Sequence, residues 1–354
     1  MTIAKIDSTT LEQVQANVDT TFTWDYERSR PALGKLYEKA KTSQWNVTTD
    51  LDWSIDVDPE KVAAELSGGT TMRFRTLQNV DDSPVRHFGE KEWSEVGVQM
   101  QNSLLSQFLH GEQGALLCTA RIVETVPWID AKYYASTQVM DEARHVEVFA
   151  KYLDEKLTSQ YRINDNLRLL LNDILADSRW DITYLGMQIM VEGLALAAFG
   201  MMQHITNEPL LKQLLRYVMA DEARHVAFGV LSLQEYYREL SDAEMRERQE
   251  FAFDAASRLQ QRFMQAEVWE RMGVDPKAVR RALDANNPPE QQIFQQMLFS
   301  KIVPNCKKLG LLDAADGWLR ERFTETGVIQ FEDWVDTGEE YTDLDAVAQD
   351  RASA

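Results

Sequence analysis

The six-residue stretch Asp-Glu-Ala-Arg-His-Val occurs twice in this chain, at 141–146 and again eighty positions later at 221–226. Each copy also has a glutamate thirty positions before its own, which gives the pairs Glu112/Glu142 and Glu192/Glu222. An internal repeat indicates how a chain is built and should be interpreted before single residues. We interpret this repeat as a helical hairpin that is used twice.

The midpoints of the two glutamate pairs carry residues typical of turns. The first midpoint is Pro127, and the second is position 207, inside Thr206-Asn207-Glu208-Pro209. Such residues end or begin helices. Two helices folded back at each midpoint place the paired glutamates at one height, about 22 Å from the turn. Two such hairpins packed together predict an all-α fold in which four helices meet at one level.

The glutamates and histidines of the repeat are expected to face the core. Positions three, four and seven residues from each glutamate are mostly apolar, and His145 and His225 share these faces because they follow Glu142 and Glu222 by three positions. Uncompensated buried carboxylates cost several kcal/mol each. Two divalent cations would balance four carboxylates, and one Glu-x-x-His pair per hairpin is typical of di-iron bundles. The predicted metal ligands and catalytic centre are therefore Glu112, Glu142, His145, Glu192, Glu222 and His225.

Oxygen and imidazole ligands favour iron or manganese, whereas zinc often occupies thiolate sites. A duplicated structural network of ion pairs is the alternative. Asp141 and Asp221 are expected to hydrogen-bond the metal-bound imidazoles, and Arg144 and Arg224 to pair with nearby acids. The residues expected to line a substrate pocket beside the metals are Phe108, Leu116, Phe149, Leu196 and Phe199.

The remaining sequence suggests one domain over residues 1–337, with the bundle core at about 90–240 and further helices before and after it. The acidic segment 338–354 is expected to be a flexible tail. A capping box, Ser241 with Glu244, predicts a helix running towards Gly273. The segments expected to be non-helical are roughly 46–58, 67–90, 273–277 and 285–289.

Composition restricts the partners and the location. The net charge of -20 and pI near 4.7 argue against nucleic acid and anionic membranes. Only two cysteines occur, Cys118 and Cys306, and the N-terminus lacks an apolar signal segment, so we expect a soluble protein in the reducing cytoplasm. The most apolar stretch, around 193–202, is about half as long as a membrane span requires.

The repeated pattern, a glutamate followed by Asp-Glu-x-Arg-His, resembles the ribonucleotide reductase small-subunit-like branch of the ferritin-like di-iron carboxylate superfamily. The resemblance covers roughly residues 90–240. It implies a ferritin-like four-helix bundle with additional N- and C-terminal helices. It also implies that the same six residues are ligands of two irons, which activate dioxygen in the reduced state.

Departures from the subfamily patterns leave the reaction open. Phe149 stands where radical-generating subunits carry a tyrosine, and Glu112 where they commonly carry an aspartate. Ala195 and Leu196 stand where hydroxylases and desaturases often have a threonine, and Val218 where arylamine N-oxygenases have a third histidine.

The function predicted is a di-iron oxidoreductase that uses O2 to hydroxylate, N-oxygenate or desaturate a small or medium organic substrate. A mixed manganese–iron centre remains open. Electrons would come from a ferredoxin or reductase, and a homodimer is expected. The alternatives are a ferroxidase or iron-storage protein, and a structural helper whose bundle serves protein contacts.

Overall fold

The computed structural model describes residues 11–157, 159–286 and 298–335, and the side chains of 67–73 and 298 are not described. The described residues contain helices and no strand. The expected tail at 338–354 lies outside them. The α-helices are α1 (Pro31–Thr42), α2 (Pro59–Arg75), α3 (Glu90–Thr125), α4 (Ile129–Lys156), α5 (Asp165–Ala176), α6 (Trp180–Tyr184), α7 (Glu192–Ile205), α8 (Pro209–Tyr237), α9 (Asp242–Arg262), α10 (Ala266–Arg271), α11 (Pro276–Asn286), α13 (Ile302–Lys308) and α14 (Trp318–Glu325).

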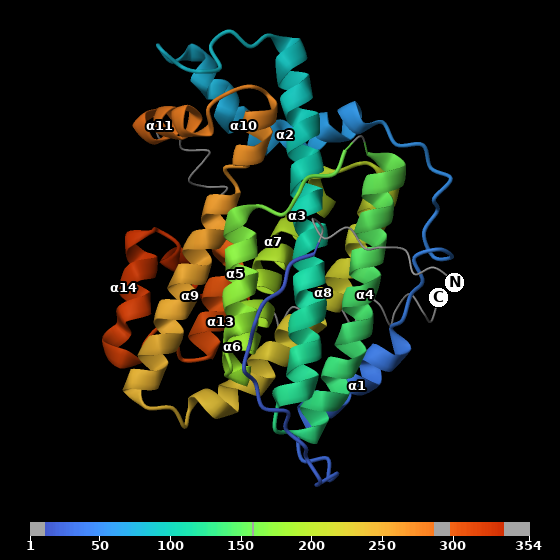
Figure 1. The fold of residues 1–354 in the computed structure, drawn as a ribbon, viewed down its shortest axis with the longest axis vertical. Helices are drawn as coiled ribbons and strands as arrows, with labels where there is room; N and C mark the ends of the chain where they lie inside the picture. Colours follow the sequence, from blue (N-terminus) through green and yellow to red (C-terminus); the bar gives the residue numbers. More distant parts are fainter. Residues whose placement is uncertain (1–10, 158, 287–297, 336–354) are drawn as a thin grey trace.

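Two antiparallel hairpins form the bundle, and the prediction of their turns is confirmed. α3 and α4 are joined at 126–128, and α7 and α8 at 206–208. Glu208 caps the N-terminal end of α8, because its carboxylate accepts hydrogen bonds from the backbone N–H groups of Leu210 (2.8 Å) and Leu211 (2.6 Å). Figure 1 shows α3, α4, α7 and α8 running along the long axis, with α9, α13 and α14 on one side of them.

The capping box predicted at the start of α9 is present. The Ser241 hydroxyl accepts a hydrogen bond from the backbone N–H of Glu244 (3.4 Å), and the Glu244 carboxylate accepts one from the backbone N–H of Ser241 (2.8 Å). The helix does not continue to Gly273, however. It ends at Arg262, because Gln265 adopts a left-handed backbone conformation (φ 47°) that a right-handed helix cannot contain.

The prediction that 46–58 is irregular is confirmed, but the prediction that 67–90 is non-helical is wrong over its first part. α2 continues to Arg75, and a 3-10 turn follows at Thr76–Asn79. Glycines such as Gly68 lower helix propensity by only about 1 kcal/mol, which packing of α2 on α3 can override. Within 273–277, Pro276 begins α11, as proline at a first helical position can. α11 also takes in 285–286, and 287–289 lie outside the described residues.

One stretch, Trp180–Ile205, is long and apolar enough to cross a membrane by length and composition alone. Of its most apolar window, 83% is buried inside the protein. Such burial is typical of the central helix of a large core. This stretch carries Glu192 at its middle, where α7 begins.

Candidate metal centre

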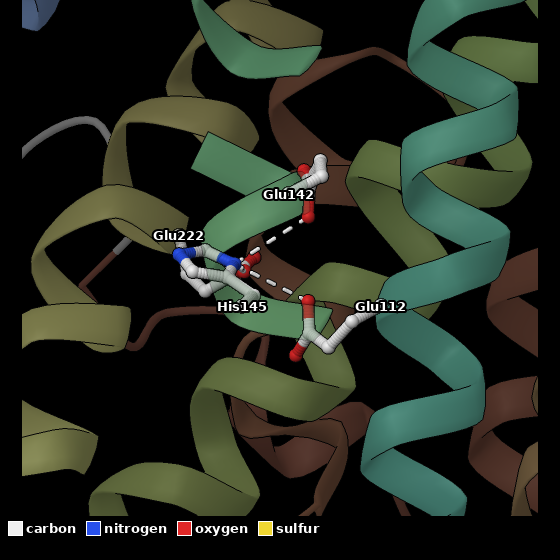
Figure 2. Close-up of side chains that lie close together, drawn as sticks. All are labelled: Glu112, Glu142, His145 and Glu222. Carbon is white, nitrogen blue, oxygen red and sulfur yellow. Dashed lines mark hydrogen bonds and ion pairs between the residues drawn. The ribbon is translucent and has the colours of Figure 1, made fainter. Parts of the chain in front are cut away.

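The six residues predicted as ligands come together at one level of the bundle. Each is at most 5% exposed to solvent. Figure 2 shows how α3, α4 and α8 present the residues of one group towards a common point. The side-chain ligand atoms form two groups, in each of which they lie within 4.8 Å of one another: Glu112, Glu142, His145 and Glu222 in the first, and Glu142, Glu192 and His225 in the second.

Both imidazoles direct Nδ1 at the carboxylates. Nδ1 of His145 lies 3.1 Å from Glu222 Oε1, 3.3 Å from Glu112 Oε2 and 3.4 Å from Glu142 Oε2. Nδ1 of His225 lies 3.1 Å from Glu142 Oε1 and 3.6 Å from Glu222 Oε2. One nitrogen of each imidazole therefore belongs to the carboxylate cluster.

The other nitrogen of each imidazole contacts an aspartate of the opposite hairpin. Nε2 of His145 donates to Asp221 (3.2 Å), and Nε2 of His225 donates to Asp141 (3.3 Å). An ionised carboxylate can only accept, so Nε2 carries a proton, and in the neutral imidazole the lone pair lies on Nδ1, where it can bind a metal ion. The predicted aspartate–imidazole contacts are present, and they run crosswise between the two halves of the repeat.

Arg144 and Arg224 hold the two aspartates in place. Arg144 donates to Asp141 and, at 3.2 Å, to Asp221; Arg224 donates to Asp221 and lies 3.5 Å from Asp141. All four side chains are buried. The paired charges form a compact cluster next to the imidazoles. The contacts expected between these arginines and nearby acids are therefore present.

The segment after α1 adds contacts that the sequence pattern did not predict. The indole N–H of Trp45 donates to Asp221 Oδ2 (2.8 Å), and the amide of Gln44 reaches Asp141 Oδ1 (3.4 Å) and also contacts Arg144. No periodic relation links these residues to the repeat, so sequence spacing contained no signal for them. Because Trp45 contacts Asp221 and Gln44 contacts Asp141, the two aspartates have different surroundings.

A π-helical segment, Leu185–Val191, sets the direction of Glu192. Such segments insert an extra residue into a helix and occur often at functional sites. It packs closely on α8 at Gly229, where an added Cβ would lie 2.5 Å from the Cβ of Gln188. Glycine at this position therefore allows Glu192 and His225 to approach the same point.

The chemistry of this cluster fits bound cations. Five of its buried atoms have no hydrogen-bond partner: Glu142 Oε2, Glu192 Oε2, Glu222 Oε1, Glu222 Oε2 and His225 Nδ1. Buried polar atoms normally have partners, and each exception calls for an explanation. Metal ions would satisfy these atoms, and the charges of two divalent ions would offset four carboxylates.

The protons of the cluster compete with metal ions. Burial, followed by repulsion from Glu222, raises the pKa of Glu112 to about 8 and raises the pKa of Glu192 well above its usual value. Burial opposes the charging of His145, but its carboxylate contacts, Asp221 first, outweigh burial and raise its pKa. Metal binding must therefore displace protons near neutral pH.

Iron(II) affinity is therefore expected to rise as pH increases through about 8, the pKa of Glu112, by about tenfold per pH unit for each proton displaced. The sign follows because a raised pKa means that the proton, not the metal, is favoured as pH falls. Anaerobic calorimetric titrations at several pH values, in buffers of different ionisation enthalpy, would measure both the affinity and the protons released. An affinity independent of pH, with no proton release, would contradict this reading of the cluster.

A cavity of about 310 Å³ opens beside the cluster and includes space continuous with solvent. Its wall contains Glu112, Glu192 and Glu222 and, of the five predicted pocket residues, Phe108. The further lining residues, which the sequence did not single out for this role, are Gln107, Gly111, Ala115, Val191, Ala195 and Arg262.

The other four predicted pocket residues do not line this cavity, and their role in a substrate pocket stays a prediction. Phe149 and Phe199 pack behind Phe108, with ring centroids 6.2 and 4.6 Å from its ring. Leu196 is buried and Leu116 is half-buried, both outside the lining. One lining residue, Arg262, belongs to α9, which lies outside the repeat from which the prediction was made.

The model of the p-aminobenzoate N-oxygenase AurF family matches residues 27–310. The chain belongs to the AurF family. This membership confirms the resemblance to ferritin-like di-iron carboxylate proteins and the prediction of an oxygenase that acts on an organic substrate.

The solved structures that match this chain include R2-like ligand-binding oxidases. A valine-to-isoleucine mutant with an anaerobically reconstituted Mn/Fe cofactor is 21% identical, with a TM-score of 0.48, over 80% of this chain and 94% of that chain. The oxidase with an aerobically reconstituted metal cofactor after photoconversion is also 21% identical, with a TM-score of 0.44, over 87% and 94% of the two chains. No curated protein matches the chain.

Proposed function

We propose that Glu112, Glu142, His145, Glu192, Glu222 and His225 bind two iron ions, or one manganese and one iron, and that the enzyme oxygenates a small organic substrate. The observation that carries the proposal is the convergence of these six buried side chains, five of whose atoms lack hydrogen-bond partners, at the wall of a cavity. Metal ions of this kind supply the reduction of O2, which no amino-acid side chain can perform.

The surrounding residues would position the ligands and exclude water. Asp141 and Asp221 keep the imidazole protons on Nε2, and their contacts with Arg144 and Arg224 hold the carboxylates in one orientation. Phe108 limits access of water to the reacting atoms from the cavity side. The protein would then contribute binding, orientation and a dry environment to the chemistry of the metals.

The reaction would be a monooxygenation in which an external ferredoxin or reductase supplies electrons to a cytoplasmic homodimer. N-oxygenation of an aromatic amine is the first outcome to examine, because the name of the family describes that reaction. Hydroxylation and desaturation are the alternatives to be distinguished by the product.

The test is a single turnover with labelled oxygen. Protein loaded anaerobically with two equivalents of iron(II) is exposed to ¹⁸O2 with a panel of small aromatic amines, phenols and alkanes, and products are analysed by mass spectrometry. We expect O2 consumption, a change in the visible absorption of the protein and ¹⁸O in one product. Iron oxidation that yields only ferric mineral would identify a ferroxidase, and protein that binds no iron would overturn the proposal.

A further inference from the structure

Four polar side chains form a stripe along one face of the otherwise apolar helical stretch Trp180–Ile205. They are spaced by three, four and four positions, which keeps them on one side of a helix. This polar stripe consists of Asp181, Tyr184, Gln188 and Glu192, each at most 2% exposed to solvent. Since Glu192 is a proposed metal ligand, the polar stripe runs from the metal centre towards the start of α6.

The polar stripe contains atoms that the described residues do not satisfy. The Tyr184 hydroxyl, both amide atoms of Gln188 and Oε2 of Glu192 have no hydrogen-bond partner among these residues. Buried polar groups of folded proteins nearly always have a partner, and an ordered water molecule is a common one. A comparable group on the other side of the metal level is satisfied within the protein, since the Tyr152 hydroxyl donates to Glu208 (3.1 Å).

α8 forms the facing side of the polar stripe. An added Cβ at Gly229 would lie 2.5 Å from the Cβ of Gln188, so this glycine allows the two helices to approach closely. Ser232 follows one turn later and lies beside Tyr184: burial raises the pKa of Tyr184, and the Ser232 hydroxyl lowers it in part. The two hydroxyls are not aligned for a hydrogen bond, and that of Ser232 has no other partner among the described residues. Groups that can hold water therefore line the polar stripe on both sides.

The polar stripe reaches the protein surface at its far end. Asp181 lies 2.9 Å from Nε of Arg248, and Arg248 also lies 3.4 Å from Glu247, whose side chain is 58% exposed. Tyr237 of α8 lies near this group, because Asp181 adds to the rise that burial causes in the pKa of Tyr237. Polar groups therefore extend from Glu192 to a solvent-exposed carboxylate.

The spacing of the polar stripe fits bridging water molecules. At 1.5 Å per residue, Gln188, Tyr184 and Asp181 lie about 6, 12 and 17 Å from Glu192 along the helix. A separation of about 5–6 Å between successive groups is too long for a direct hydrogen bond, but one water molecule with two hydrogen bonds can span it.

The polar stripe and the cavity lie on opposite sides of the metal level. The rings of Trp180 and Trp128 are 5.0 Å apart, so α6 begins at the end of the bundle where α3 joins α4. α3 ends there, so Gln107 and Phe108 of the cavity wall, which precede Glu112, lie on the other side. Water in the polar stripe would therefore approach the metals without passing through the cavity.

We propose that water molecules held by the polar stripe carry protons from the surface at Glu247 to the metal centre at Glu192. The inference rests on the proposed function, because oxygenation is the reaction that takes up the protons. In a monooxygenation, R–H, O2, two protons and two electrons from the external reductase give R–OH and water. The hydroxyls of Tyr184 and Ser232 both accept and donate hydrogen bonds, so each can take a proton from one water molecule while giving one to the next. The cavity then supplies no protons and stays dry for the substrate.

The first test is the position of water in a crystal structure of the purified wild-type protein, at a resolution that shows ordered water. We expect water molecules that are hydrogen-bonded to Gln188, Tyr184 and Ser232 and that connect Asp181 with Glu192. Replacing glutamine by leucine in Gln188→Leu should remove at least one of them. A polar stripe without water would overturn the proposal, whether or not the protein reacts with O2.

The second test compares two variants in which a buried tyrosine becomes phenylalanine. Tyr184→Phe removes a hydroxyl of the polar stripe, and Tyr152→Phe is the matched control on the other side of the metal level. Iron(II)-loaded proteins are mixed rapidly with O2 in H2O and in D2O, and the steps of the visible absorption change are timed. In wild type, one step should be slower in D2O because it takes up protons. Tyr184→Phe should slow that step about tenfold or more and leave iron content, unfolding temperature and the other steps unchanged.

Tyr152→Phe should behave as wild type, and Ser232→Ala, a second variant in case Tyr184→Phe does not fold, should show the same slowing. The proposal is wrong if no step depends on D2O, if both variants of the path keep the wild-type rate, or if Tyr152→Phe slows the step equally. No reaction of the wild type with O2 would instead overturn the proposed function and with it the need for protons. A dry polar stripe, or an unaffected rate in a protein that does react, would overturn the path alone.

Discussion

Replacing Glu142 by alanine is expected to prevent both metal ions from binding and to reduce oxygenation to background. Glu142 is the one residue shared by the two groups of ligand atoms. Its Oε1 lies 3.1 Å from Nδ1 of His225, and its Oε2 lies 3.4 Å from Nδ1 of His145. Glu142→Ala would take one candidate ligand from each group and would leave the charges of two bound cations less compensated. We expect the metal affinity to fall by more than the roughly 10–100-fold loss that is typical when a residue that only supports a ligand is replaced.

Metal analysis of the purified variant, together with anaerobic iron titration, would measure this effect. Glu147→Ala is the control, because Glu147 is an exposed acid on the same helix. Metal-free Glu142→Ala is also expected to be less stable than metal-free wild type, because burial raises the pKa of Glu142 but its contacts with His225 and His145 outweigh burial and lower it, and the variant leaves these imidazoles without that partner. Two tightly bound ions in Glu142→Ala would show that the metals lie elsewhere.

The position of the metal centre could be predicted because helical geometry converts sequence spacing into height and direction. A spacing of thirty positions between paired glutamates, with a turn at the midpoint, places both at one level, and a spacing of three positions from glutamate to histidine keeps them on one face. Gln138 follows the same rule: it is in phase with Glu142 and donates to Glu142 (2.9 Å) and Glu192 (3.0 Å). Contacts that follow from helix phase and from the shared height of the glutamates were therefore accessible from the sequence.

Contacts that depend on how the hairpins cross, or on segments outside them, were not accessible. The crosswise pairing of Asp141 with His225 and of Asp221 with His145 requires the relative orientation of α4 and α8. Trp45 reaches the centre from an irregular segment that has no periodicity to interpret. Phe149 does face the core, but the helix phase could not show that Phe108 stands between it and the cavity.

Replacing Asp221 by asparagine is expected to weaken one metal site selectively, by about 10–100-fold in affinity. Asp221 accepts the Nε2 proton of His145, so its charge keeps Nδ1 free for a metal and makes the imidazole a better ligand. An asparagine can present its NH2 group to Nε2 instead, which favours the tautomer with the proton on Nδ1. The ion held by Glu112, His145 and Glu222 should therefore be lost first.

The matched variant Asp141→Asn should weaken the other ion, because Asp141 contacts His225. Both variants also leave Arg144 and Arg224 with one anion fewer, and since a buried partner is removed we expect about 3 kcal/mol of lost stability in each. Trp45→Phe is the control for Asp221, since it removes one hydrogen bond and should cost only about 1 kcal/mol. Metal occupancies refined from anomalous diffraction of the two variants would distinguish the sites. If each aspartate controlled the ion bound to the histidine of its own helix, the crosswise arrangement would be contradicted, because adjacency in sequence would then outweigh the contact across the bundle.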